Sequence, residues 1–143
     1  MKITEIKDIS EVELLLSGCS LPTSDLKLND KVQLFGACQN ENLIACIGVE
    51  IYGNAALLRS LAVVSEYRKE GIGKLLSEYV ENYCKQEGVK EVYLLTETAK
   101  EYFEKLGYKT QKREDAPLTI KGTTQLSGLC PSSSNFMIKL LNG

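Results

Sequence analysis

Residues 58–75 read LRSLAVVSEYRKEGIGKL, and this stretch decides how the chain folds. Its first seven residues are apolar except for Arg59 and Ser60, which is typical of a strand buried on both faces. Gly71 and Gly73 follow in a turn, and a helical pattern begins directly behind them. Such a turn points several backbone N–H groups outward at a helix N-terminus, where they favour an anion such as a phosphate. On the two glycines alone, a plain turn that enters a core helix stays the alternative.

The helix behind this turn is predicted over residues 71–86, with Gly88 at its C-terminal end. Its apolar positions recur three and four residues apart and form one continuous stripe. The stripe consists of Ile72, Leu75, Leu76, Tyr79, Val80, Tyr83 and Cys84.

Strands and helices follow one another along the rest of the chain. A helix is predicted to start near residues 8–10, where two capping-box patterns overlap, and another covers residues 98–106 with Thr98 as its N-cap. Residues 112–134 are expected to be irregular. The pattern predicts a layered α+β fold, with residues 1–143 in a single domain. Strands are predicted at residues 2–5, 32–38, 43–51, 56–64, 89–95, 108–111 and 136–141.

Composition and charge exclude several classes of function. Lys and Arg total 17 and Asp and Glu total 19, a formal net charge of −2 that argues against binding to nucleic acid. No apolar run approaches the roughly 20 residues of a membrane span. The polar residues 1–8 do not resemble a signal peptide. We therefore expect a cytoplasmic protein with neither a membrane nor a nucleic acid as its partner.

The absence of histidine narrows the chemistry further. A His-based triad, a His general base and a His metal site are all excluded. The five cysteines are scattered and contain no CxxC pair, so no metal site is expected. They are interpreted as small buried hydrophobic residues in a reducing compartment.

Two separate motifs carry a resemblance to a known family. Residues 68–73, RKEGIG, resemble the R/Q-x-x-G-x-G/A signature of the GNAT superfamily of acetyl-CoA-dependent N-acetyltransferases. Residues 60–68 resemble the strand and turn that precede this signature, with Ser65 in place of the usual Pro. Residues 99–108, AKEYFEKLGY, resemble the A-x-x-F-Y-E-K-L-G-F segment of the superfamily. Two motifs in this order are far more specific than either alone.

The resemblance implies the GNAT fold, a mixed and mostly antiparallel sheet of roughly six to seven strands with helices on both faces. It implies that the sheet is splayed open after the strand that ends near Val64. It also implies acetyl-CoA as the cosubstrate, without a metal. The backbone of Leu61, Ala62 and Val63 would pair with the pantetheine amides. The diphosphate would be held at Arg68, Lys69, Glu70, Gly71, Ile72, Gly73 and Lys74.

A closer likeness is to acetyltransferases encoded with arsenic-resistance genes and to the acetyltransferase domain of bacterial N-acetylglutamate synthases. It is carried by residues 57–63, 94–99, 102–108 and 129–133. This likeness implies that the acceptor is a small amine or an amino-acid-like molecule, and it leaves a homodimer open. Ser134 falls near the position where the glutamate synthases carry a serine, so it is a candidate acceptor contact.

The general base can be sought by counting residues across the turn predicted at residues 53–54. In a hairpin centred there the numbers of opposed residues sum to 107, so Glu50 opposes Leu57 and Gly48 opposes Arg59. Opposed residues share a face of the sheet, as do residues two apart. Many members of the superfamily carry a carboxylate at the position of Leu57. Glu50, directly across, is predicted to supply the missing base, either itself or through a water molecule.

Arg59 interrupts an apolar strand, and a buried guanidinium needs a partner. One interpretation is bidentate capture of the acceptor's carboxylate, and the other is a structural ion pair with Glu50. A pair that is closed in the empty site and opened by the substrate would combine the two. Thr96, at the end of a predicted strand, is a further candidate contact for the acceptor.

Phe103 stands where many members carry a tyrosine that protonates the departing thiolate. Tyr102 is about 100° away around the helix, so that role is not transferred to it. Because a free thiol has a pKa of about 8.5, the thiolate can leave without a strong acid. The leading hypothesis is a small-molecule N-acetyltransferase. The carboxylate missing at Leu57 and the tyrosine missing at Phe103 leave an acyl-CoA sensor without turnover as one alternative. A protein or peptide N-acetyltransferase is the other.

Overall fold

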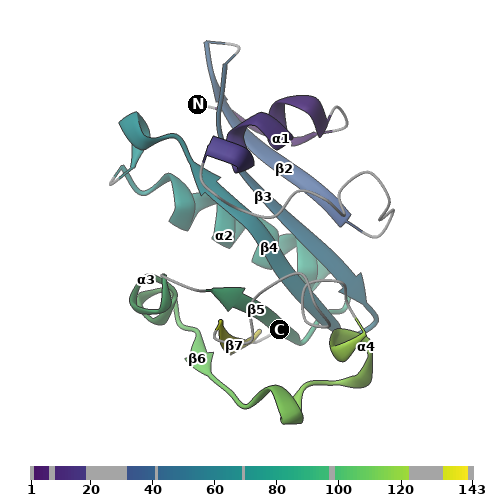
Figure 1. Ribbon diagram of the computed structural model, residues 1–143. Helices are drawn as coiled ribbons and strands as arrows, with labels where there is room; N and C mark the ends of the chain where they lie inside the picture. Colours follow the sequence, from purple (N-terminus) through teal and green to yellow (C-terminus); the bar gives the residue numbers. More distant parts are fainter. Residues whose placement is uncertain are drawn as a thin grey trace.

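Seven strands of the described chain form one mixed sheet in the order β1-β2-β3-β4-β5-β7-β6 (Figure 1). The structure is a computed structural model that describes residues 2–6, 9–18, 32–40, 42–68, 70–96, 99–122 and 134–141. The strands are β1 (Lys2–Ile6), β2 (Val32–Gln39), β3 (Asn42–Tyr52), β4 (Ala55–Val63), β5 (Glu91–Thr96), β6 (Lys109–Thr110) and β7 (Asn135–Leu140). This sheet confirms the predicted fold class.

The sheet opens between its two central strands. All neighbouring strands pair antiparallel except β4 and β5, which run parallel. Their pairing covers only Ala55 to Leu57 on β4, opposite Glu91 to Tyr93 on β5. Beyond Leu57 the edge of β4 has no paired strand among the described residues, which is the geometry that an extended ligand uses when it adds as a strand. The sheet is therefore splayed, as predicted.

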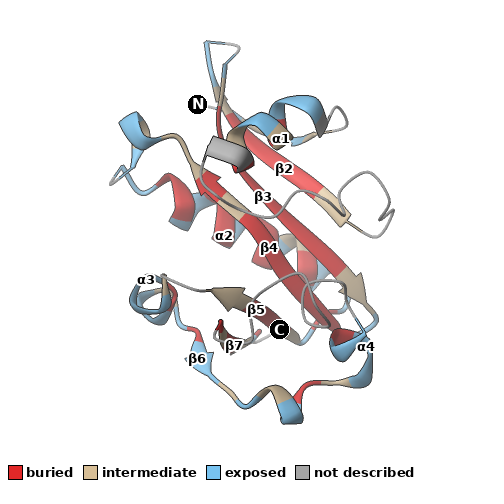
Figure 2. Cartoon of the chain, in the orientation of Figure 1, coloured by how far each residue is buried: buried red, intermediate tan, exposed pale blue. Residues whose placement is uncertain are grey.

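Helices cover both faces of the sheet, and the burial of the central strands follows from this (Figure 2). Helix α1 (Ile9–Gly18) packs on one face through Val12 and Leu16, which lie in a cluster with residues of β2, β3 and β4. Helices α2 (Ile72–Gln86) and α3 (Lys100–Lys105) pack on the other face. Strands covered on both sides are apolar in both directions, which explains the nearly continuous hydrophobic runs.

The bounds of α2 agree with the sequence, but its buried face is rotated from the predicted stripe. Gly71 is the N-cap in a left-handed conformation, and Gly88 adopts a positive φ just after the helix. Leu75 and Tyr79 are 46% and 41% exposed. Ser77 and Glu81 are buried in their place. Glu81 is accommodated because Tyr108 and Lys139 of β7 pair with its carboxylate, whereas Oγ of Ser77 is buried without a hydrogen-bond partner in the described chain.

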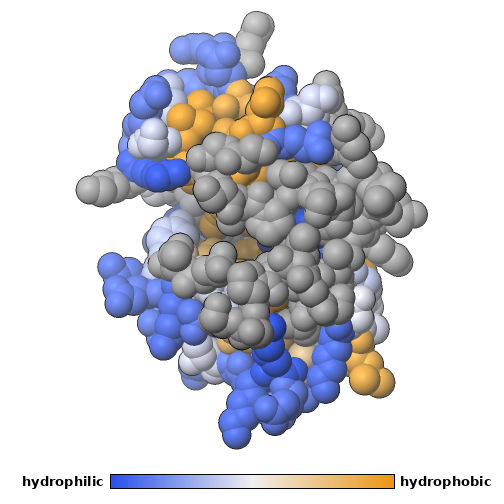
Figure 3. Space-filling view, in the orientation of Figure 1, coloured by the Kyte–Doolittle hydropathy of each residue, from blue (hydrophilic) through white to orange (hydrophobic). Residues whose placement is uncertain are grey.

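Residues 112–122 are more regular than predicted. They contain the 3₁₀ turn η2 (Arg113–Asp115) and the helix α4 (Leu118–Lys121). Elsewhere in the chain, the 3₁₀ turn η1 (Ser65–Tyr67) follows β4. Helix α4 buries Ile120 in a cluster that includes Leu57, on the same face as α1. Leu118 on α4 and Leu14 on α1 remain 84% and 77% exposed, and the space-filling view has hydrophobic surface at both helices (Figure 3).

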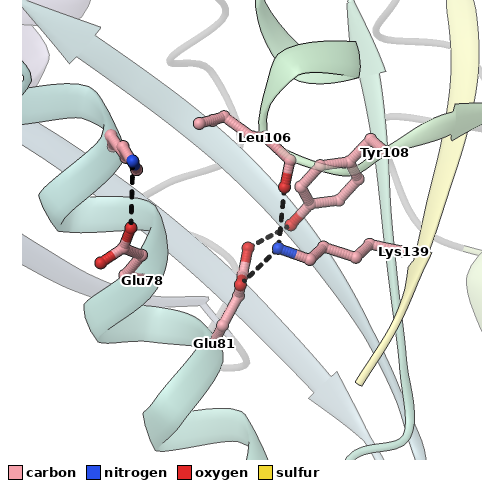
Figure 4. A network of polar contacts seen from close by, with 6 residues as sticks. Glu78, Glu81, Leu106, Tyr108 and Lys139 are labelled. Atoms are coloured by element: carbon pink, nitrogen blue, oxygen red, sulfur yellow. Dashed lines mark hydrogen bonds and ion pairs between the residues drawn. The ribbon is translucent and has the colours of Figure 1, made fainter. Parts of the chain in front are cut away.

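A polar network ties α2 to its neighbours on the same face of the sheet (Figure 4). The Lys139 ammonium donates to Oε1 of Glu81 at 2.9 Å and to the carbonyl of Leu106 at 2.8 Å. The Tyr108 hydroxyl donates to Oε2 of the same Glu81 at 3.2 Å. Burial, with the Glu81 charge beside it, raises the pKa of Tyr108 well above its usual value. The network therefore joins α2, the end of α3 and β7.

We expect Lys139→Met to lower the free energy of unfolding by about 1–3 kcal/mol, because it leaves the buried Glu81 carboxylate without its cation. Lys74→Met is the matched control. Its ion pair with Glu78 is 4.0 Å long and exposed on both sides, so its loss should cost less than about 0.5 kcal/mol. Urea unfolding of both variants measures the difference. Equal losses would contradict this role for the network.

The cysteines of the described chain form no disulfide with one another. Cys46 and Cys84 are buried, Cys38 is half-buried, and Cys19 and Cys130 lie outside the described residues. Burial, followed by the charges of Glu81 and Glu87, raises the pKa of Cys84 to about 12. Within the described ranges no cluster of potential ligands could hold a metal ion. No described helix is long and apolar enough to cross a bilayer.

Candidate active site

The register of the β3–β4 hairpin is the one counted from the sequence. Glu50 opposes Leu57, and Gly48 opposes Arg59. Further along, Cys46 opposes Ala62. The step from Gly48 to Cys46 on β3 therefore matches the step from Arg59 to Ala62 on β4, which is one residue longer. One extra residue on a strand makes a β-bulge, which bends the strand and increases its twist. The bulge lies directly after Arg59, at the stretch where β4 has already parted from β5.

Ser60 forms this bulge. It has a φ of 58°, a conformation that non-glycine residues rarely adopt. Its backbone carbonyl accepts a hydrogen bond from the Cys46 thiol at 3.3 Å, and its Oγ accepts one from Nε of Arg59 at 3.2 Å. These contacts hold the strained residue in place and connect it to the Arg59 guanidinium. Strained backbone of this kind is concentrated at functional sites.

Arg59 and Glu50 form a buried ion pair. Nη1 of Arg59 donates to Oε2 of Glu50 at 2.9 Å, and both side chains are 0% exposed. The Tyr52 hydroxyl donates to the other carboxylate oxygen, Oε1. The structure therefore brings together the two residues that the sequence assigned to the reaction. It adds Tyr52, which shares their face because it lies two residues after Glu50 on the same strand.

A second tyrosine–carboxylate contact lies on the same face of the sheet, further from the ion pair. The Tyr93 hydroxyl donates to Oε2 of Glu91. Burial, then the hydrogen bond with Glu91, raises the pKa of Tyr93 above its usual value. The contact borders a cavity of about 600 Å³ that does not include the ion pair. Its lining consists of Glu91, Tyr93, Gly107, Lys109, Gln111, Ile138, Lys139 and Leu140.

The first turn of α2 offers unpaired backbone donors. The N–H of Leu75 bonds to the carbonyl of Gly71 at 3.1 Å, and the three N–H groups before it, on Ile72, Gly73 and Lys74, have no partner within the helix. No acidic side chain lies in this turn. A Cβ on Gly71 would meet no atom within 4 Å, so the space beside the turn is open. These donors and the helix dipole favour an anion.

The charged residues of the glycine turn, residues 68–74, have different environments. Nε of Arg68 donates to the carbonyl of Val63 at 2.9 Å, which ties the turn to the end of β4. Glu70 and Lys74 are exposed, and Lys69 lies outside the described residues. On β4 itself, Ala62 is buried, whereas Leu61 and Val63 are half-buried at the unpaired edge.

Tyr102 and Phe103 take opposite places on α3. Phe103 is buried in the core and packs edge-on against Tyr108. Tyr102 is 40% exposed, and its hydroxyl occupies the place where a Cβ on Gly73 would stand. Burial raises the pKa of Tyr102 above its usual value. The sequence had excluded Tyr102 as a simple replacement for the missing tyrosine and gave no sign that it would contact the glycine turn.

Thr96, the last residue of β5, and Ser134, which directly precedes β7, lie at the same end of the sheet. Thr96 opposes Asn135, the residue after Ser134. Oγ1 of Thr96 accepts a hydrogen bond from the N–H of Ala99 at 3.0 Å, which is the kind of contact expected of Thr98. Thr98 itself lies outside the described residues. Oγ of Ser134 is buried and has no hydrogen-bond partner in the described chain. Neither residue is hydrogen-bonded to the Glu50–Arg59 pair.

Comparison with known proteins identifies the family. The sequence profile of the family described as "Acetyltransferase (GNAT) domain" matches residues 30–110, which is more than half of the chain. An uncharacterised N-acetyltransferase of Chlorobaculum tepidum is 39% identical over 87 residues, which cover 60% of this chain and 56% of that protein. The chain thus matches little more than half the length of this relative.

Solved structures share the fold. A GNAT-family acetyltransferase of Staphylococcus aureus Mu50 superposes with a TM-score of 0.79 and 22% identity, over 99% of both chains. The N-acetylglutamate synthase of Neisseria gonorrhoeae, crystallised with coenzyme A and N-acetylglutamate, also gives a TM-score of 0.79. Its identity is 16%, and the match covers 100% of this chain and 36% of the synthase. The profile match, the two motifs and the splayed sheet agree, and the chain therefore belongs to the GNAT family of acetyltransferases.

Proposed function

We propose that this chain is an acetyl-CoA-dependent N-acetyltransferase whose acceptor is a small amino-acid-like molecule. The observation that carries the proposal is the buried Glu50–Arg59 ion pair, which lies beside the open edge of β4. A buried ion pair contributes little net stability compared with an apolar pair of similar volume. It does present one anion and one cation, and an amino acid carries the two complementary groups. The pair is therefore suited to open around a zwitterion.

The coenzyme end of the site is supported by the free donors of α2 and by the unpaired edge of β4. Acetyl-CoA supplies the acetyl group as a thioester. In this proposal the N–H groups of residues 72–74 and the positive charge of Arg68 and Lys74 hold the diphosphate. The backbone of Leu61, Ala62 and Val63 pairs with the pantetheine amides as an added strand would. The open space beside Gly71 fits a group that approaches the backbone closely.

At the acceptor end, Arg59 exchanges Glu50 for the carboxylate of the acceptor, and Glu50 pairs with the acceptor's ammonium. Glu50 then takes a proton from the ammonium, which frees the nitrogen lone pair to attack the thioester carbonyl. The new C–N bond forms as the C–S bond breaks. The second amine proton leaves to the thiolate or to solvent. Thr96 and Ser134 are proposed as further contacts of the acceptor at the same end of the sheet.

A thiol-release assay with acetyl-CoA tests this function directly. The panel contains amino acids, simple amines and a lysine-containing peptide. Release of coenzyme A with at least one amino acid, and none with the peptide, is the expected result. If no acceptor in the panel releases coenzyme A and acetyl-CoA binds tightly, an acyl-CoA sensor would be favoured instead. Turnover of the peptide alone would favour a protein acetyltransferase.

The role of the glycine turn is tested by a matched pair of substitutions. Gly71 and Gly53 have φ values of 78° and 67°, and a Cβ at either position would meet no atom within 4 Å. Each change to alanine should therefore cost about 1–2 kcal/mol of stability through backbone strain alone. We expect only Gly71→Ala to weaken coenzyme A binding as well, by about tenfold, because it disturbs the donors of α2. Calorimetric titration with coenzyme A measures this, and equal affinity in both variants would contradict the assignment.

A further inference from the structure

We propose that Tyr52 is a positioning residue for Glu50, an inference that rests on the proposed role of Glu50 as the base. The two oxygens of the Glu50 carboxylate have different partners. Oε2 accepts from Arg59 at 2.9 Å, and Oε1 accepts from the Tyr52 hydroxyl. When an acceptor binds, Arg59 leaves Oε2 of Glu50 and pairs with the acceptor's carboxylate. The hydrogen bond from Tyr52 to Oε1 remains, and it keeps Oε2 aimed at the acceptor's amine.

Burial makes this second contact necessary. The Glu50 side chain is 0% exposed, so it has no solvent to stabilise its charge. While Arg59 pairs with the acceptor's carboxylate, Glu50 is left with the acceptor's ammonium as its charged partner, and burial disfavours the charged form of any carboxylate. A protonated Glu50 cannot accept a proton from the acceptor. A hydrogen bond donated to the anionic form opposes this protonation, and Tyr52 supplies it.

The placement of Tyr52 suits this task. It is the last residue of β3 and opposes Ala55, and its half-buried ring packs against the cluster that contains Ala55 and Ile120. The ring is therefore held by packing against a cluster to which β4 and α4 both contribute. Its hydroxyl reaches back along β3 to the carboxylate two residues earlier. Phenylalanine at this position would keep the ring contacts and lose only the hydroxyl.

Other charged and titratable groups of the described chain surround this face and have other environments. On the strands of this face these are Cys46 of β3, which donates to Ser60, and Tyr93 of β5, which donates to Glu91. Val32, which opposes Glu50 from β2, does not titrate. The helices over this face add Glu11, Glu13 and Lys121, of which Glu13 is half-buried and the other two are exposed.

The test compares Tyr52→Phe with Tyr93→Phe, because each removes a hydroxyl that donates to a carboxylate on the same face of the sheet. One readout is the titration midpoint of the Glu50 carboxyl carbon, followed by carbon-13 NMR in the free protein. The other is turnover against pH, measured by thiol release with acetyl-CoA and an equimolar mixture of the standard L-amino acids. For Tyr52→Phe we expect the acid limb of kcat to move to higher pH, with about a tenfold loss of turnover on the acidic side, and the carbon-13 midpoint to move in the same direction. Tyr93→Phe should change neither.

The outcomes separate this inference from the proposed function. If the midpoint and the acid limb of Tyr52→Phe both match those of the native protein, Tyr52 does not position Glu50. A shift of the same size in Tyr93→Phe would overturn the inference as well, since it would reflect a general loss of packing. Native turnover in Glu50→Gln would overturn the role of Glu50 as base. In that case the carbon-13 midpoint still decides the role of Tyr52. Tyr52→Phe moves this midpoint if the Tyr52 hydroxyl orders the Glu50 carboxylate, and leaves it unchanged if it does not.

Discussion

Replacing Arg59 by methionine is expected to abolish acetylation of amino acids and to lower the free energy of unfolding by about 3–5 kcal/mol. Both effects come from the same ion pair. Glu50 is fully buried, so the loss of the guanidinium leaves a carboxylate without its cation in the interior. The acceptor's carboxylate loses its partner in the same step. Urea unfolding measures the first effect, and thiol release measures the second.

The double variant Glu50→Gln/Arg59→Met is the control for stability. It removes both charges at once, so most of the lost stability should return, while acetylation stays absent. If the double variant is as unstable as Arg59→Met alone, the cost does not arise from an unpaired Glu50. If Arg59→Met acetylates amino acids as well as the native protein does, Arg59 does not bind the acceptor.

Replacing Glu50 by glutamine should lower kcat by about 10²–10⁴-fold, the usual contribution of a general base. The amide has nearly the same volume and cannot accept the proton. Because the glutamine amide is uncharged, it also no longer competes with the acceptor's carboxylate for Arg59. We therefore expect the variant to bind an N-acetyl amino acid, which has a carboxylate but no ammonium, about tenfold more tightly than the native protein.

Binding of coenzyme A is the control for this substitution, because Glu50 lies apart from the glycine turn. Its affinity should stay within about twofold of the native value when measured by calorimetric titration. Weaker binding of the N-acetyl amino acid would show that Glu50 does not compete for Arg59. Turnover within tenfold of native would show that the base is another group.

Much of this site could be predicted because local rules decide it. The turn at Gly53 sets the register of the hairpin, and strand alternation then places Glu50 and Arg59 on one face. The same reasoning reaches Tyr52, because it is two residues from Glu50, although the sequence gives no reason to single it out. The left-handed conformation at Gly71 likewise follows from a glycine before a helical pattern.

Other features depend on tertiary packing. The bulge is formed by Ser60, with no glycine to signal it, and is held by contacts from Cys46 and Arg59. Helix α4 has four residues, too few for a periodic pattern. Leu75 and Tyr79 match the helical stripe but are exposed, because the helix turns Ser77 and Glu81 toward its neighbours. A periodic pattern shows that a face is apolar but not which part of it is covered.

A matched pair of acceptors shows whether the Glu50–Arg59 pair opens around a zwitterion. Each amino acid that releases coenzyme A is compared with its own carboxamide, which has the same amine but no carboxylate. We expect a kcat/KM for the amino acid that is at least about 100-fold higher, because a buried Arg59 rejects a ligand that leaves it unpaired. Equal values for acid and amide, or a preference for the amide, would contradict it.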